Sequence, residues 1–242
     1  MKKVAFCTLG CKVNQYDTQA MAEILEGAGY RTVPFSEKAD VYIINTCTVT
    51  NIADRKSRQM ISRARAANPG AVICVCGCLS QSSPEEILAI EGVTCVAGTA
   101  KRSDILKVIE SAGNHVDAAG GEFEDLSVSR SGVRTRANIK IQEGCDNYCS
   151  YCIIPFVRGH ERSRALDSIM DEARRLADSG VSEIVLGGIH VSSYMSADGS
   201  DLADTVGMLN SIDGIRRIRL GSLEQPALKE DFIKRLAECQ PF

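Results

Sequence analysis

Three cysteines stand within residues 144–152, and their spacing suits metal chemistry. Cys145, Cys149 and Cys152 form a C-x3-C-x2-C pattern, and Tyr151 directly precedes the third cysteine. Three thiolates on one short loop can hold three irons of a cubane iron–sulfur cluster, which leaves the fourth iron without a protein ligand. An iron that lacks a protein ligand can bind another molecule, so the pattern predicts a reactive site rather than a structural one.

Zinc and plain thiols are the alternatives for this loop. Structural zinc normally takes four ligands, commonly from paired C-x2-C units. The only histidine nearby is His160, and the sequence has no second C-x2-C unit. The spacing C-x3-C-x-aromatic-C, just after a strand-like run at 137–141, resembles the signature of radical S-adenosylmethionine (SAM) enzymes. We therefore predict an iron–sulfur cluster held by Cys145, Cys149 and Cys152.

A second set of cysteines follows three other strand-like runs. Cys11 follows the first run, Cys47 the second and Cys78 the third. Ligands gather outside the carboxyl ends of the strands in open parallel sheets, so these cysteines can converge and form another three-thiolate site. Cys76 is an alternative to Cys78. We favour Cys78 because Gly77 lets the chain turn out of the strand before it.

The other cysteines are expected to be ordinary small buried residues, since cysteine is among the most buried residue types. This group comprises Cys7, Cys74, Cys95 and Cys239. The chain has 11 cysteines in 242 residues, and its start has no apolar segment typical of a secretion signal. We therefore expect a reducing, cytoplasmic location in which metal ligation is favoured over a disulfide framework.

The overall charge and hydropathy favour neither a general attraction to nucleic acid nor a membrane span. The net charge of −3 gives no global attraction to nucleic acid. No apolar run approaches the roughly 18 residues of a membrane span. Local basic runs exist, with Arg55, Lys56, Arg58, Arg63 and Arg65 in one and Arg158, Arg162 and Arg164 in the other. The first run is either a solvated helix face or a contact for RNA, and the second can bind phosphates.

The elements that position these residues form two blocks. In residues 1–112, short apolar runs alternate with amphipathic stretches, which predicts an open parallel sheet with helices on both faces. The expected strands are 4–6, 41–44, 72–75 and 93–97, and the expected helices are 15–28, 52–67, 84–90 and 102–112. Residues 113–135 are rich in Gly, Ser and charge and indicate a linker with room for an extended segment.

The second block, 136–242, reads as three βα units of a barrel-like sheet. The expected strands are 137–142, 182–187 and 216–220, and the expected helices are 167–179, 202–211 and 228–239. The chain ends directly after the last helix. We therefore predict an N-terminal α/β domain, a linker, and the first part of a (β/α) partial barrel.

Four motifs, in this order, resemble the methylthiotransferase family of radical SAM enzymes. They lie at 8–14 (TLGCKVN), 45–50 (NTCTVT), 77–78 (GC) and 141–155 (IQEGCDNYCSYCIIP). The resemblance covers nearly the whole chain. It implies that Cys11, Cys47 and Cys78 bind an auxiliary 4Fe–4S cluster. It also implies that Cys145, Cys149 and Cys152 bind the 4Fe–4S cluster that cleaves SAM.

The chemistry that the resemblance implies uses SAM twice. One SAM, chelated by the open iron, yields a radical that takes hydrogen from carbon 2 of a substrate adenine. The auxiliary cluster supplies sulfur, which a second SAM methylates. The protein positions these groups and excludes water. The implied partners are tRNA and an unidentified electron donor, flavodoxin-like or similar, while the oligomeric state stays undetermined.

Within the family, residues 9–15 (LGCKVNQ) most resemble the branch that acts on threonylcarbamoyladenosine beside the tRNA anticodon. The isopentenyladenosine branch and the branch acting on a ribosomal-protein aspartate are the near alternatives. Two different classes also stay open, namely an iron–sulfur binding or electron-transfer module without radical chemistry and a zinc-dependent RNA-binding protein. Family members have a complete barrel and a C-terminal RNA-binding domain, so we expect this chain to be an incomplete, N-terminal portion that is inactive alone.

Several residues beside the cysteines have two interpretations. Tyr151 either packs against the adenine of SAM or against the barrel. Gly187 and Gly188 end the second strand of the block, where they either let the backbone approach the methionine end of SAM or only make a turn. Asn14, Asn45 and Thr46 either donate hydrogen bonds to cluster sulfurs or cap turns and helices. His190 is a polar residue near the strand end, and we assign it no role.

Overall fold

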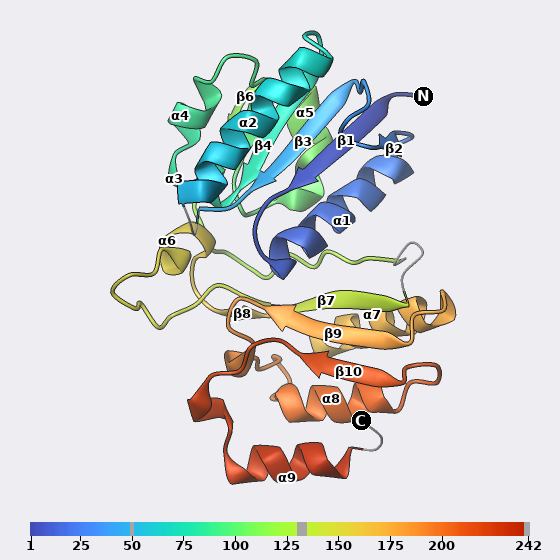
Figure 1. The fold of residues 1–242 in the computed structure, drawn as a ribbon. Helices are drawn as coiled ribbons and strands as arrows, with labels where there is room; N and C mark the ends of the chain where they lie inside the picture. Colours follow the sequence, from blue (N-terminus) through green and yellow to red (C-terminus); the bar gives the residue numbers. More distant parts are fainter. Residues whose placement is uncertain (49–50, 130–134, 240–242) are drawn as a thin grey trace. The chain divides into compact units, whose positions relative to one another are not determined.

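The computed structural model describes residues 1–48, 51–129 and 135–239. Positions 49–50 of the second motif, positions 130–134 of the predicted linker and positions 240–242 lie outside the described residues. The chain forms two compact units (Figure 1). The first unit combines Met1–Leu126 with Tyr148–Gly159, and the second combines Ser127–Asn147 with His160–Phe242.

The first unit contains a six-stranded sheet in the order β2-β1-β3-β4-β5-β6, in which every neighbouring pair is parallel. Its strands are β1 (Lys3–Thr8), β2 (Arg31–Val33), β3 (Val41–Thr46), β4 (Val72–Gly77), β5 (Cys95–Ala97) and β6 (Gly113–His115). Its helices are α1 (Lys12–Gly27), α2 (Asn51–Ala67), α3 (Cys78–Ser82), α4 (Pro84–Leu88), α5 (Ile105–Glu110) and α6 (Ile154–Arg158), with a 3-10 turn at Arg102–Asp104.

Helices cover both faces of this sheet because its strands are apolar on both faces. Val41 and Ile43 of β3 pack with apolar residues of α1 and α5. Tyr42 and Ile44, which alternate with them, pack with apolar residues of α2 and α4 on the other face. The predicted open parallel-sheet α/β domain is confirmed.

The second unit contains a four-stranded sheet in the order β10-β9-β7-β8. Strands β7, β9 and β10 are parallel, and β8 is antiparallel to β7. The elements are β7 (Arg136–Glu143), β8 (Arg162–Ser163), α7 (Leu166–Asp178), β9 (Glu183–Gly188), α8 (Leu202–Asn210), β10 (Arg217–Leu220) and α9 (Glu230–Glu238), with 3-10 turns at Val191–Ser193 and Gln225–Ala227. These are the three βα units predicted for the start of a partial barrel.

The elements that the sequence did not predict are all short. They are β2, β6, β8, α3 and α6. Each has too few residues to show a periodic apolar pattern. Strand β6 lies inside the predicted linker and adds the sixth strand to the first sheet. Helix α1 begins at Lys12, three residues before its predicted start at 15, and no side chain caps its first turn.

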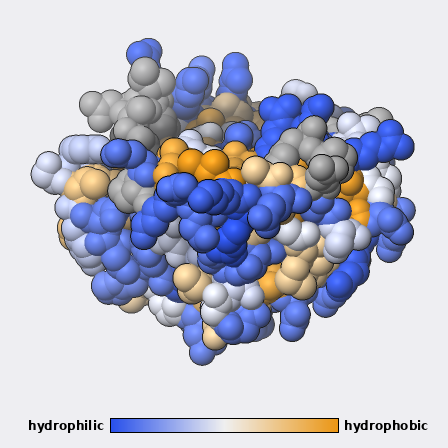
Figure 2. All heavy atoms as spheres, turned by 90° about the horizontal axis from the view of Figure 1, so that it is seen from below, coloured by the Kyte–Doolittle hydropathy of each residue, from blue (hydrophilic) through white to orange (hydrophobic). Residues whose placement is uncertain are grey.

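The last strand and helix of the second unit are sparsely covered. Among the described strands, β10 pairs with β9 alone. None of the residues of α9 is buried, and Leu228 and Ile233 are about half exposed. Figure 2 shows apolar side chains gathered between hydrophilic ones on the face seen from below. A partial barrel leaves this kind of edge open.

Across the described residues, no helix has both the length and the apolar character that crossing a membrane requires.

Candidate metal centres

The carboxyl ends of three strands meet at one edge of the first sheet. Thr8 of β1 pairs with Asn45 of β3, and Thr46 of β3 pairs with Gly77 of β4. The three cysteines predicted to hold the auxiliary cluster follow these strand ends. Cys11 directly precedes α1, Cys47 directly follows β3, and Cys78 is the first residue of α3. The structure therefore brings all three to the same edge.

The surroundings of Cys78 shift its ionisation. Burial raises the pKa of Cys78, the Arg158 guanidinium lowers it, and the neighbouring thiols of Cys11 and Cys47 raise it further. Cys47 and Cys78 are buried, whereas Cys11 is exposed. Two buried thiols with a third at the surface suit a metal group that is held by the protein on one side and is open on the other.

The loop before Cys11 closes tightly on Cys47. Gly10 has a φ of +108°, which favours glycine. A Cβ atom at Gly10 would lie 2.6 Å from the Cβ of Cys47 and 2.9 Å from its Sγ. Any side chain at position 10 would displace the Cys47 thiol, so the absence of one keeps this thiol beside the Cys11 loop.

Asn14 ties the strand ends together. Its Nδ2 donates hydrogen bonds to the backbone oxygens of Leu9 (2.9 Å) and Thr46 (2.8 Å). Asn45 Nδ2 donates to the backbone oxygen of Asn14 at 3.0 Å, and Thr46 Oγ1 donates to that of Cys76 at 2.6 Å. These hydrogen bonds go to backbone groups, while Cys11 Sγ lies 3.7 Å from Asn14 Oδ1. Both predicted roles, hydrogen bonds to cluster sulfurs and the capping of turns and helices, stay predictions.

Cys76 lies in a different environment from Cys78. It is 3 % exposed and belongs to the apolar layer that β4 shares with α1 and α5. Burial raises the pKa of Cys76 to about 12, which opposes the thiolate form that binds iron. The geometry therefore supports Cys78 as the third ligand, and this role stays a prediction.

We expect Cys76→Ala to keep the auxiliary cluster and Cys78→Ala to lose it. The Cys76 change removes one buried sulfur and costs about 1 kcal/mol of folding free energy. The measurement is iron content per protein after anaerobic reconstitution, with a thermal melt of each variant. Loss of iron in Cys76→Ala together with retention in Cys78→Ala would reverse the assignment.

The remaining cysteines lie where ordinary packing residues were expected. Cys74 and Cys95 are buried within β4 and β5, and Cys7 is half-buried in β1. Cys239 is half-buried directly after α9. These positions agree with a role in packing.

Two cysteines of the C-x3-C-x2-C motif belong to the first unit. The backbone N–H of Cys152 donates to the oxygen of Cys149 at 2.9 Å, which closes a tight turn. Tyr148 adopts a φ of +44° and packs edge-to-face on Phe156, with ring centroids 6.1 Å apart. Tyr151 is 90 % exposed. Both roles predicted for Tyr151, packing against the adenine of SAM or against the barrel, stay predictions.

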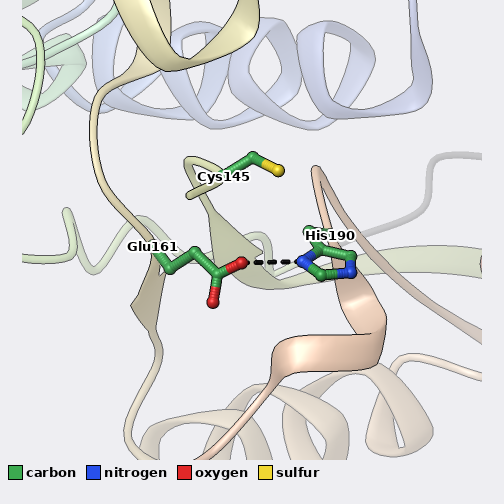
Figure 3. Close-up of side chains that lie close together, drawn as sticks. All are labelled: Cys145, Glu161 and His190. Atoms are coloured by element: carbon green, nitrogen blue, oxygen red, sulfur yellow. Dashed lines mark hydrogen bonds and ion pairs between the residues drawn. The ribbon is translucent and has the colours of Figure 1, made fainter. Parts of the chain in front are cut away.

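Cys145 follows β7 in the second unit and lies beside two polar side chains (Figure 3). One ligand atom each from Cys145, Glu161 and His190 falls within 4.8 Å of the others. His190 Nδ1 is 2.7 Å from Glu161 Oε1, and its Nε2 is 3.4 Å from Glu224 Oε2. Glu161 was not predicted from the sequence, and His190 was given no role. The position of His190 just after β9 could have indicated a site residue. The carboxyl end of β9 lies at the same sheet edge as that of β7, which Cys145 follows.

Gly187 and Gly188 end β9 as predicted, and they differ in their surroundings. A Cβ atom at Gly188 would lie 2.7 Å from the backbone oxygen of Gln142. A Cβ atom at Gly187 would meet only the backbone oxygen of Ile139, at 4.0 Å. The Oε1 of Gln142 also accepts a hydrogen bond from the backbone N–H of His190 at 2.6 Å. Gly188 therefore permits close packing on β7, whereas Gly187 leaves room at the strand end.

The two predicted basic runs differ in exposure. Arg55, Lys56, Arg58, Arg63 and Arg65 are exposed on α2, so an RNA contact there stays a prediction. Arg158 and Arg164 are each 1 % exposed. Arg164 forms an ion pair with the buried Glu172. Both buried arginines have partners within the protein, which argues against phosphate binding by Arg158 and Arg164. Arg162 is half-buried, and phosphate binding by it stays a prediction.

Two regions of the chain match known families. Residues 3–98 match the uncharacterized protein family UPF0004, and residues 139–241 match the radical SAM superfamily. The C-x3-C-x2-C motif lies within the region that matches the radical SAM superfamily. A solved structure of the radical SAM methyltransferase TsrM from Kitasatospora setae has a TM-score of 0.54 at 14 % identity, over 99 % of this chain and 65 % of that one. This likeness supports the fold.

Similar sequences agree with the predicted resemblance. The chain is 44 % identical to the threonylcarbamoyladenosine tRNA methylthiotransferase MtaB of Bacillus subtilis, over 98 % of this chain and 54 % of that protein. It is 34 % identical to tRNA-2-methylthio-N(6)-dimethylallyladenosine synthase of Clostridium novyi, over 99 % and 56 % respectively. The chain spans about half the length of the curated relatives it matches. The predicted likeness to the N-terminal portion of radical SAM methylthiotransferases is confirmed.

Proposed function

We propose that the protein is a cytoplasmic tRNA methylthiotransferase, which adds a methylthio group to carbon 2 of threonylcarbamoyladenosine next to the anticodon. The observation that carries the proposal is the meeting of Cys11, Cys47 and Cys78 at one sheet edge, in a chain that also has the C-x3-C-x2-C motif. Two three-thiolate sites provide two irons without protein ligands. A radical SAM enzyme that uses a single cluster needs only one three-thiolate site, so the second site favours a two-cluster reaction.

The cofactors are two 4Fe–4S clusters and SAM. In the radical SAM superfamily, the cluster and SAM together supply a radical that removes hydrogen from the substrate. Cys145, Cys149 and Cys152 would hold one cluster, and Cys11, Cys47 and Cys78 the other. The donor sets fit because every one of these thiols is free of disulfides. The lack of a side chain at Gly10 also lets the Cys47 thiol lie against the loop before Cys11.

The residues around the cluster ligands would bind and orient the cofactor. The exposed ring of Tyr151 offers a surface on which the adenine of SAM can stack. Gly187, with open space at the end of β9, would admit the methionine end, and Gly188 would hold that strand end against β7. His190 and Glu161, hydrogen-bonded together beside Cys145, would provide a polar wall for the same site. The proposed partners are tRNA and a small electron-donor protein, flavodoxin-like or similar.

Reconstitution with iron and sulfide tests the class of function. Anaerobically reconstituted complete protein, given SAM and dithionite, should form 5′-deoxyadenosine. Iron uptake without 5′-deoxyadenosine would indicate an electron-transfer module. Cys145, Glu161 and His190 also resemble a three-ligand zinc set. Zinc without iron in protein isolated anaerobically would therefore contradict the proposal and favour a zinc protein.

A further inference from the structure

Arg158 ends α6, the short helix that follows the C-x3-C-x2-C motif, and it lies at the cysteine site of the first sheet. The residue is 1 % exposed. It is 80 residues from Cys78 along the sequence, yet its Nε lies 3.3 Å from the Cys78 sulfur. A buried guanidinium is costly unless it is paired and hydrogen-bonded, so each of its partners contributes to keeping it there.

The guanidinium of Arg158 reaches three different partners. Besides the sulfur of Cys78, its Nη2 donates to Asn14 Oδ1 at 2.6 Å, and its Nη1 is 3.7 Å from Asp17 Oδ2. Asp17 also pairs with Arg102, whose Nε is 2.9 Å from the same oxygen. Asp17 therefore lies between two cations, and Asn14 is the residue that ties the strand ends of β1 and β3.

The ion pair with Asp17 does not explain why Arg158 also contacts the sulfur of Cys78. A neutral thiol accepts hydrogen bonds only weakly, whereas a thiolate accepts a charged donor strongly. Asp17 and Asn14 already meet part of the guanidinium's need for hydrogen-bond acceptors and negative charge. The donor directed at the sulfur therefore suits a Cys78 that is held as a thiolate ligand, and the positive charge of Arg158 lies beside it.

We infer that Arg158 positions Cys78 and raises the reduction potential of the auxiliary cluster. This inference rests on the proposed function, because it needs a cluster at Cys11, Cys47 and Cys78. Hydrogen bonds to ligand sulfurs and nearby positive charge stabilise the state that carries one more electron. The same side chain anchors α6, so the turn that contains Cys149 and Cys152 is attached to the auxiliary site within the first unit.

Arginine suits this role because its planar group donates in several fixed directions. Lysine retains the charge and has no planar fork, so it cannot reach the sulfur, the amide oxygen and the carboxylate in the same way. Glutamine retains an amide donor and loses the charge. Comparing the two substitutions therefore separates the hydrogen-bond geometry from the charge.

The test is a redox titration of the complete, reconstituted protein, followed by electron paramagnetic resonance. Cys145, Cys149 and Cys152 are replaced by alanine so that the signal comes from the auxiliary cluster alone. Into this background go Arg158→Lys, Arg158→Gln and a control, Arg174→Lys. Arg174 is an exposed residue of α7 that pairs with Asp171. Both Arg158 variants should shift the midpoint potential to more negative values, the glutamine variant further, while the control matches the background.

Iron content and the melting temperature of the apoprotein decide the other outcomes. Loaded Arg158 variants with the potential of the background protein would overturn the inference. Loss of iron with an unchanged apoprotein melt would support the positioning of Cys78. Loss of iron together with the folding transition would overturn it too, because Arg158 would then be a structural ion-pair residue only. A background protein that takes up no iron would instead refute the auxiliary site of the proposed function.

Discussion

Replacing Cys145, Cys149 and Cys152 together by alanine will remove half of the iron from the reconstituted protein and abolish the cleavage of SAM. Two cubane clusters correspond to about eight irons in the unchanged protein, with four in each. The three thiolates of the motif are the only bonds from the protein to that cluster in the proposed function. The open iron of that cluster would bind SAM, so no cleavage should remain once the three thiolates are removed. Iron analysis and 5′-deoxyadenosine formation with dithionite measure the two effects.

The matched experiment replaces Cys11, Cys47 and Cys78 by alanine. This variant should also lose half of the iron, but it should still form 5′-deoxyadenosine, because the other cluster is intact. Transfer of the methylthio group should be lost. An unchanged iron content in this second variant would show that the cysteines at the sheet edge are not cluster ligands. The two variants thus separate the sites by the activity each retains.

Deleting the gene should remove 2-methylthio-threonylcarbamoyladenosine from tRNA and leave the isopentenyl form untouched. The threonylcarbamoyl group carries a carboxylate, and burying this charge without a partner is costly. The substrate pocket should therefore place an arginine or lysine near the adenine, since arginine can bind a carboxylate through two hydrogen bonds. An apolar isopentenyl substituent would leave the polar groups of this pocket without partners, so the enzyme should discriminate strongly against that substrate. Mass spectrometry of nucleosides from digested tRNA measures both forms.

The control for this prediction is the same strain carrying the gene on a plasmid, with the three motif cysteines either intact or replaced. Only the intact gene should restore the modified nucleoside. Loss of the isopentenyl form alone would place the protein in the other tRNA branch. An effect confined to a ribosomal protein would assign it to the branch that modifies aspartate.

The sequence by itself indicated which residues could carry chemistry, and it determined the class of fold. The C-x3-C-x2-C spacing involves residues close together in the sequence, so it can be recognised without a structure. The alternation of apolar runs and amphipathic stretches also reflects local periods, and it predicted the long elements, such as β3, α7 and β9, to within a few residues. Even the meeting of Cys11, Cys47 and Cys78 could be expected, because parallel strands all end at one edge of a sheet.

Only the tertiary structure decided which side chains surround those cysteines. Cys76 and Cys78 are two residues apart, and a continuing strand would place them on the same face. Gly77, at a φ of +96°, ends the strand and starts α3, so Cys76 stays in the apolar layer and Cys78 joins the other thiols. Arg158 is 144 residues from Asn14 along the chain, yet the two are hydrogen-bonded. Periodicity reports only neighbours along an element, whereas contacts at such separations arise from how the elements pack. The pair of Glu161 and His190 beside Cys145 escaped prediction for the same reason.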